Sequence, residues 1–247
     1  FRAVYDDLSA GQIKANELEP LYYIGVKTKQ FEVFTKNGFL FPNKPYKSIG
    51  FLNSFRVHNH ESNYGQKSFD ATQYSGYANL IYQTIIGTTD HKIKIGGSYV
   101  YDNYNKSLNQ SYKFGKIESV PGAFIEYAYN DQKKTALVLG LRADHHNTFG
   151  AFITPRAHYK YNFTDKSAFR LSAGRGFRTA NPIIENSGTM ASSRNILFND
   201  NDLKPEIAWN YGTSVTHLFE FAEKEMNFSF DYYYTDFTNQ VVVDMEN

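Results

Sequence analysis

Strict alternation of apolar and polar residues over long runs is the feature that most limits what this chain can fold into. From Ile153 to Phe163 the odd positions are apolar or aromatic and the even positions are polar or charged. The segment from Phe169 to Arg178 has a similar alternation. Successive side chains of a strand point to opposite faces, so each segment is predicted to be a strand with one apolar and one polar face.

Runs with the same period recur along the chain, and no helical period competes with them. The sequence predicts an all-β fold of about ten to twelve strands, arranged as an antiparallel up-and-down meander. The further strands are expected at 21–41, 47–60, 77–86, 92–102, 122–130, 134–146, 207–221 and 226–236.

Alternation alone does not separate a membrane barrel from a soluble β-sandwich, because both have one apolar face. Most runs hold about 10 to 16 residues, whereas a globular strand usually has about 5 to 6 and a tilted membrane strand needs about 9 to 11. The connections also alternate in length, as in membrane barrels. Short turns are expected at 87–90, 130–133, 164–166 and 222–225, and longer loops at 61–69, 103–116 and 179–205.

Tyrosines cluster near the ends of the apolar faces, with aliphatic residues between them. Tyr99, Tyr101, Tyr232 and Tyr234 lie toward the long loops, and Tyr127, Tyr129, Tyr159 and Tyr161 lie toward the short turns. Two belts of aromatic residues, one on each side of an apolar band, are typical of a barrel that faces lipid.

The polar faces carry charges of both signs, which suits the wall of a wet interior. The same pattern fits the solvated face of a soluble sheet, so this alternative stays open. The residues expected to face the lumen or a plug include Arg142, Arg156, Arg170 and Arg178.

Composition excludes several classes of protein. The chain has no cysteine, so it has neither a disulfide framework nor a thiolate metal site. Its 26 basic and 25 acidic residues nearly cancel, which argues against nucleic acid as a partner. No run of 18 apolar residues is present, so a spanning helix is not expected. The chain opens at Phe1 without the features of a signal peptide, and we interpret it as a truncated piece.

The search for catalytic and metal sites gives weak candidates only. His58 and His60 fall on one face of a strand and Glu61 follows, but two histidines without a third ligand are weak evidence for a metal site. No nucleophile elbow, phosphate-binding loop or dinucleotide fingerprint occurs. We therefore predict that the chain is not an enzyme and that it holds no cofactor and no metal.

Three stretches resemble the motifs of one known family. Leu171–Pro182 (LSAGRGFRTANP) is similar to a barrel motif in which a glycine-rich strand end carries Gly-Phe-Arg, then a small residue and Pro. Leu203–Glu206 (LKPE), followed by Tyr211 and Gly212, resembles the start of the next strand in that family, and Asp231–Gln240 resembles the strand after it. In this order they resemble TonB-dependent outer-membrane receptors, particularly those of Bacteroidetes type.

The resemblance implies an antiparallel barrel that is 22-stranded in the intact family member. Residues 1–247 would form part of that transmembrane β-barrel, with the plug domain absent from the chain. It further implies a receptor in the cell outer membrane for energy-coupled uptake of a scarce nutrient such as an iron–siderophore or cobalamin. The implied partners are outer-membrane lipid, a small-molecule ligand, the receptor's own plug domain and the TonB energy-coupling complex. The alternative function is a soluble all-β carbohydrate-binding or adhesion module.

Ligand capture is expected in the long loops, since loops on a rigid scaffold commonly carry binding residues. The candidate ligand-binding residues are Tyr64, Tyr112, Asn181, Glu185, Asn186, Arg194 and Asn195.

Overall fold

The computed structural model describes residues 1–14, 22–192 and 203–242, and its strands form a single sheet. Eleven strands within these ranges follow one another in chain order, each antiparallel to its neighbours, which confirms the predicted meander. The strands are β1 (Arg2–Lys14), β2 (Tyr22–Phe41), β3 (Lys44–Tyr64), β4 (Lys67–Ile86), β5 (Thr88–Leu108), β6 (Tyr112–Asn130), β7 (Thr135–His146), β8 (Gly150–Thr164), β9 (Ser167–Arg178), β10 (Glu206–Phe221) and β11 (Lys224–Thr238).

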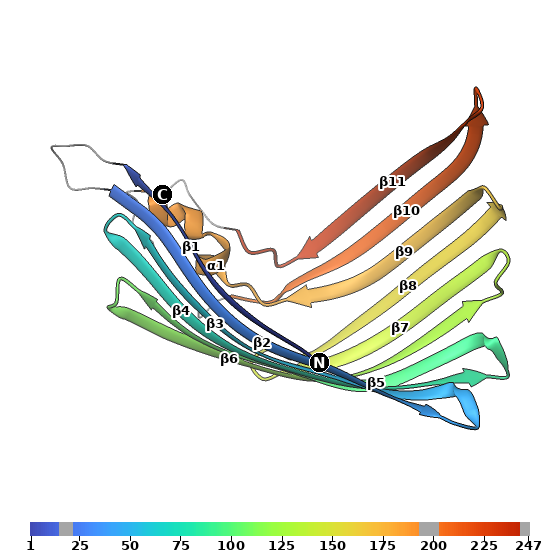
Figure 1. Ribbon diagram of the computed structural model, residues 1–247, viewed down its shortest axis with the longest axis horizontal. Helices are drawn as coiled ribbons and strands as arrows, with labels where there is room; N and C mark the ends of the chain where they lie inside the picture. The colour runs from blue at the N-terminus through green and yellow to red at the C-terminus, as the bar shows by residue number, and fades with distance from the viewer. Residues whose placement is uncertain (15–21, 193–202, 243–247) are drawn as a thin grey trace.

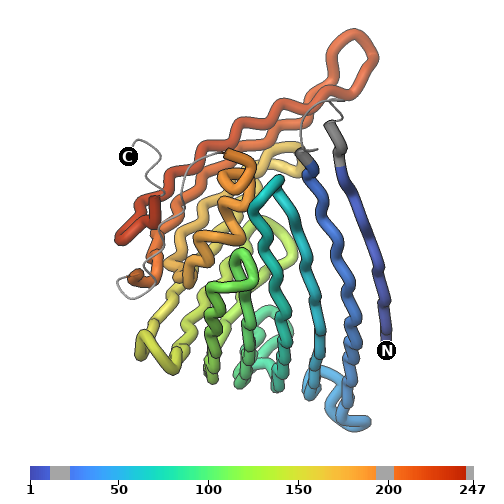
Figure 2. The backbone as a smooth tube through the Cα atoms, turned by 90° about the vertical axis from the view of Figure 1, so that its left-hand side faces the viewer, coloured from blue at the N-terminus to red at the C-terminus, as the bar shows by residue number. Residues whose placement is uncertain are grey.

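The sheet is strongly curved, and its only described helices lie on the concave side (Figure 1). These are the short helix α1 (Pro182–Glu185) and a 3-10 helix, η1 (Ser187–Ala191). We call the concave face the inner face and the opposite one the outer face. The end of the sheet that carries α1 is the α1 end, and the other, with its tight turns, is the hairpin end (Figures 1 and 2). Neither described helix has the length and apolar character needed to cross a membrane.

The outer face exposes a band of aliphatic side chains at its middle. The register places these residues on one face, because each is paired with or diagonal to another of the set. Exposed apolar area on this scale is unfavourable in water, so the face is built to meet an apolar surrounding. The exposed band includes Leu80, Ile95, Ile125, Leu139, Leu141, Ile153, Leu171 and Val215.

Aromatic residues flank the band on the same face. Tyr74, Tyr99 and Tyr211 lie toward the α1 end and are exposed. Tyr159 and Phe163 lie toward the hairpin end and are also exposed. This is the distribution that the sequence predicted for a wall in contact with lipid.

The predictions of long loops at 61–69 and 103–116 are wrong. Residues 61–69 form the ends of β3 and β4 with a turn of two residues between them, and 103–116 form the ends of β5 and β6 around a turn at 109–111. Both ends are polar on the outer face, so they lack the apolar alternation that marks a strand in lipid, yet their backbones stay paired. Tyr64 and Tyr112, predicted as loop residues, are therefore strand-end residues.

The sequence analysis also missed β1, which pairs with β2 over its whole length. One side of β1 and one side of β11 have no neighbouring strand within the described ranges. Unpaired edges of this length are a liability in lipid and in water, because their backbone N–H and C=O groups lack partners.

The turn between β10 and β11 has two residues, Ala222 and Glu223, with φ of 52° and 60°. Two positive φ values define the turn type that best matches strand twist, and this type favours Asn-Gly. L-residues other than Gly and Asn pay roughly 1 to 2 kcal/mol in this conformation. Replacing the pair by Asn-Gly (A222N/E223G) is expected to stabilise the fold by about 1 kcal/mol, measured as a higher urea midpoint of the purified protein in detergent. A lower midpoint would contradict the strain argument.

Candidate functional site

The segment 179–192 crosses the inner face at the α1 end and is held there by an apolar contact. Met190 and Ile183 are buried against Phe69 of β4, and Met190 is 1% exposed. Tyr64 and Phe114 pack around the same cluster from β3 and β6. Burial of these side chains fixes the segment over strands that lie far from β9 in the sheet.

Polar contacts hold the same segment along its path. Thr179 Oγ1 donates to Glu118 Oε1 at 2.7 Å, which ties the start of the segment to β6. Lys106 Nζ of β5 donates to the Asn181 side chain. Lys67 Nζ donates to the Ser192 backbone oxygen at 2.5 Å, at the β3–β4 turn. The segment therefore spans the inner face from β9 to β4.

A further ion-pair group anchors the base of this segment. Arg178 Nε donates to Glu206 Oε2 at 2.7 Å, and Arg178 Nη1 lies 3.2 Å from Glu185 Oε2. The Val241 backbone N–H donates to Glu206 Oε1 at 2.8 Å. The Val241 N–H and the Arg178 guanidinium lower the pKa of the Glu206 carboxyl. This carboxyl lies beyond the exposed tyrosines that flank the aliphatic band at the α1 end.

This lowered pKa predicts a pH dependence. A carboxyl with a depressed pKa in the folded state contributes stability above its unfolded pKa of about 4.3, and the contribution is lost as the pH falls through the folded value. We expect hydrogen-exchange protection of Val241, corrected for intrinsic rates, to fall below about pH 4 in the wild type. In Glu206→Gln it should be weaker at neutral pH and nearly independent of pH. Equal profiles would contradict the assignment.

The middle of the inner face carries charge clusters that bridge neighbouring strands. Glu126 of β6 accepts from Lys94 Nζ of β5 at 2.8 Å and from Arg156 of β8. Arg156 reaches Glu126 by crossing Gly140 of β7, where an added Cβ would lie 2.7 Å from Arg156 Nε. Glycine at this position thus leaves room for a contact across the intervening strand β7.

A second cluster lies nearer the α1 end. Arg142 Nε donates to Asp144 Oδ2 at 2.7 Å, and Arg142 Nη2 donates to Ser98 Oγ at 2.8 Å. The Asp144 carboxylate is buried, so the guanidinium supplies the opposite charge that a buried carboxylate needs. Charges on this face are thus mostly matched within the wall.

The structure separates the predicted ligand-binding residues into three groups. Asn181, Glu185 and Asn186 lie in the segment that crosses the inner face, and each also makes hydrogen bonds within that segment. Tyr64 is partly buried against the Phe69 cluster, whereas Tyr112 is exposed at the start of β6. Arg194 and Asn195 lie outside the described residues.

The four arginines expected on the lumen side share one face. Register pairing connects Arg142, Arg156, Arg170 and Arg178 to the same side of the sheet as Glu118 and Lys106, which contact the α1 segment. That side is the inner face. The sequence did not single out Glu118, Thr179, Lys106, Phe69 or Met190; the one available signal was that Phe69 and Met190 are apolar residues in stretches predicted as loops.

The histidine pair on β3 makes local hydrogen bonds. His58 Nδ1 lies 3.2 Å from Gln30 Oε1, and His60 Nε2 lies 3.0 Å from Ser62 Oγ. Burial lowers the pKa of His60. Among the described residues, no three His, Cys, Asp or Glu side chains are grouped so as to hold a metal ion.

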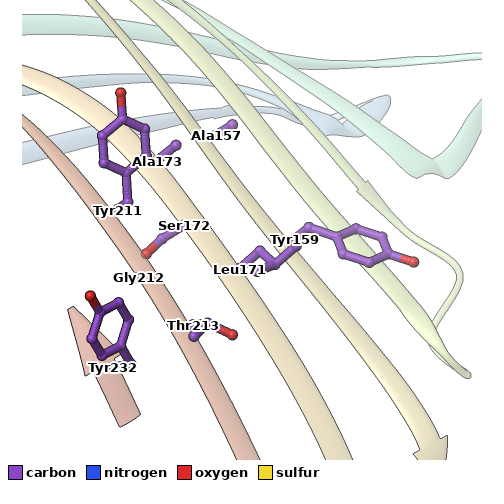
Figure 3. Close-up of a pocket in the computed structure, with 9 residues that line it drawn as sticks. All are labelled: Ala157, Tyr159, Leu171, Ser172, Ala173, Tyr211, Gly212, Thr213 and Tyr232. Atoms are coloured by element: carbon purple, nitrogen blue, oxygen red, sulfur yellow. The ribbon is translucent and has the colours of Figure 1, made fainter. Parts of the chain in front are cut away.

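Two depressions lie back to back across β8–β11. The one on the outer face, about 470 Å³, is lined mainly by apolar and aromatic side chains (Figure 3). The one on the inner face, about 650 Å³, has a mainly apolar lining to which His158, Lys160, Arg170 and Asp231 add polar and charged groups. The first meets the surroundings of the sheet, and the second opens into its concave side.

Comparison with known proteins identifies what this chain is similar to. The model of a protein family described as "TonB dependent receptor-like, beta-barrel" matches residues 19–247. No curated protein sequence matches the chain.

Solved structures share its fold at low identity. The alcaligin outer membrane receptor FauA of Bordetella pertussis is 13% identical, with a TM-score of 0.61 over 98% of this chain and 44% of that one. The siderophore receptor PirA of Pseudomonas aeruginosa is 12% identical, with a TM-score of 0.61 over 99% and 48%. The pyoverdine outer membrane receptor FpvA of Pseudomonas aeruginosa, bound to pyoverdine, is 10% identical, with a TM-score of 0.59 over 94% and 48%. The chain spans less than half the length of these three structures.

Proposed function

Because the chain belongs to the family of TonB-dependent receptor-like β-barrels, we propose that it forms part of the barrel of an outer-membrane receptor that takes up a scarce nutrient. The observation that carries this proposal is the division between the two faces. The outer face exposes an aliphatic band flanked by aromatic residues, while the inner face carries the charge clusters and the α1 segment. Such a division suits a wall between lipid and a wet interior.

The division of faces also argues against a soluble carbohydrate-binding or adhesion module. A soluble β-domain buries its apolar face against a second layer. Here Leu141 is 49% exposed and Leu171 is 44% exposed. The match to a receptor family supports the membrane assignment as well.

The ligand class we propose is a small molecule such as an iron–siderophore or cobalamin. The structural neighbours include a siderophore receptor, an alcaligin receptor and a pyoverdine receptor. Capture would involve the α1 end, where Tyr112 is exposed and Asn181, Glu185 and Asn186 lie on the crossing segment. The lumen arginines would line the path below it.

The partners follow from the same proposal. Outer-membrane lipid would contact the aliphatic band, and further strands of the receptor would pair with the edges of β1 and β11. A plug domain would occupy the concave side, and the TonB energy-coupling complex would drive release of the ligand. We assign no nucleic-acid partner and no catalytic role.

The test uses the full-length receptor in its own bacterium. Deletion of its gene should abolish saturable binding and uptake of one labelled compound from a panel of ferric siderophores and cobalamin. A protonophore should stop uptake and leave binding intact. Fractionation should recover the receptor in outer membranes, and release without detergent would favour the soluble module instead. Unchanged uptake of every panel compound in the deletion strain would contradict the proposed ligand class.

A further inference from the structure

The inner-face depression toward the hairpin end is lined by two cations, Lys160 and Arg170. It measures about 650 Å³ and lies over β7–β11, and its polar lining includes His158, Lys160, Arg170, Asp231 and Tyr233. Elsewhere on this face Arg142, Arg156 and Arg178 each contact a carboxylate. Within residues 1–14, 22–192 and 203–242, Lys160 and Arg170 have no such contact.

Lys160 and Arg170 are direct cross-strand partners in the β8–β9 register. Like charges at directly opposite positions destabilise a sheet. Neither side chain forms an ion pair within the described part of the chain. Arg170 Nη1 donates to Thr216 Oγ1, a neutral acceptor, at 3.2 Å. The excess positive charge is therefore uncompensated at this point of the wall.

The charged groups around this pair do not remove the imbalance. Asp231 is on β11, separated from Arg170 by Ser214 of β10, and accepts from Ser229 Oγ at 3.2 Å. His158 adds an imidazole on the same face of β8. An anion that enters the depression would meet two cations and few competing carboxylates.

The floor of the depression has room for a planar group. Small residues at Ala136, Ser172 and Gly212 leave space between the strands. The Tyr233 ring lies beside Gly212, where an added Cβ would be 2.8 Å from ring atom Cε1 and 2.6 Å from Ser172 Oγ. Glycine is thus required for the ring to take this position, and the ring lines the same depression as the two cations.

From this arrangement we propose that the inner wall holds a binding site for small organic anions, with Lys160 and Arg170 as carboxylate or phosphate ligands and Tyr233 as a stacking surface. Volume, apolar lining and a few convergent polar groups are those of a small-molecule pocket. The role of this site rests on the proposed transport function. The site lies toward the hairpin end, away from the α1 end where capture is proposed. An anionic solute would bind here late on its path through the receptor.

The test measures binding of phthalate, a planar dicarboxylate, to the purified full-length receptor in detergent. We expect calorimetry at constant ionic strength to give at least tenfold weaker phthalate binding for K160Q/R170Q than for wild type. The matched control K133Q/K134Q removes the same charge at the nearby β6–β7 turn and should bind phthalate as wild type does. The readout needs no transport, so it stands or fails independently of the uptake assay.

Thermal stability provides the second measurement. Without anions, Lys160→Gln should raise the melting temperature of the receptor, because it removes a like-charge neighbour. A lower melting temperature would mean that Lys160 pairs with an acidic group elsewhere in the full receptor, and the proposal would be wrong. Equal phthalate binding by wild type and K160Q/R170Q would overturn it too.

Discussion

Leu141→Arg is expected to prevent most of the receptor from assembling into the outer membrane. Leu141 is 49% exposed at the middle of the aliphatic band, between Ile125 on β6 and Pro155 on β8. An arginine that faces lipid at mid-membrane costs about 2 to 4 kcal/mol. This is a large part of the net stability of a typical folded protein, about 5 to 15 kcal/mol.

The matched control for this change is His145→Arg. His145 lies on the same strand and face, four residues nearer the α1 end. Arginine near a membrane interface costs only about 0 to 1 kcal/mol. Folded receptor in outer membranes, measured by its faster migration in unheated SDS gels, should fall strongly for Leu141→Arg and little for His145→Arg. Equal yields of the two variants would mean that this face does not meet lipid.

Met190→Ala is expected to release the segment that crosses the inner face. Met190 is 1% exposed and packs on Phe69, so its truncation removes buried apolar contacts and leaves a cavity. Comparable core substitutions cost about 2 to 5 kcal/mol. The polar contacts of Thr179 and Asn181 are partly exposed and replace little of this loss. Hydrogen exchange of 182–191 should therefore rise by more than tenfold.

Ile184→Ala is the matched control, since Ile184 is the neighbour of the buried Ile183 in α1 and is itself 41% exposed. It removes a side chain of similar size from the same segment without opening the cluster. Its exchange should stay within about threefold of wild type, because surface changes usually alter stability by less than about 0.5 kcal/mol. Similar exchange in Met190→Ala and Ile184→Ala would show that the apolar cluster is not what holds the segment.

The alternation of residue types made most of the sheet predictable. Where a strand has one face in an apolar medium, as at Ile153 to Phe163, the period of two is enforced at every position and the register follows. The tight turns were also readable, because two apolar runs close together leave few residues for the connection. The antiparallel meander and the inward direction of Arg156 follow from these two signals.

The sheet beyond the aliphatic band was not predictable in the same way. At the α1 end Asn59, Thr72 and Asn105 face outward on β3, β4 and β5. Because both faces of the strands are polar there, the sequence shows no alternation of apolar and polar residues. The contacts of the crossing segment were equally hidden. Glu118 and Thr179 are far apart in the sequence, and only the curvature of the sheet brings them together.

β3 to β6 stay paired beyond the aliphatic band at the α1 end, which would face outward in the receptor that we propose. Strands of about 20 residues have a path of roughly 65 Å, against an apolar band about 25 Å tall. Even with a tilt of about 45°, some 20 Å of hydrogen-bonded ladder would extend beyond the apolar band. In the receptor that we propose, the described surface at this end would then be formed by the paired ends of β3 to β6. Single side-chain substitutions on these strands would then alter its selectivity. The backbone is already ordered, so the protein would lose little conformational entropy when a solute binds.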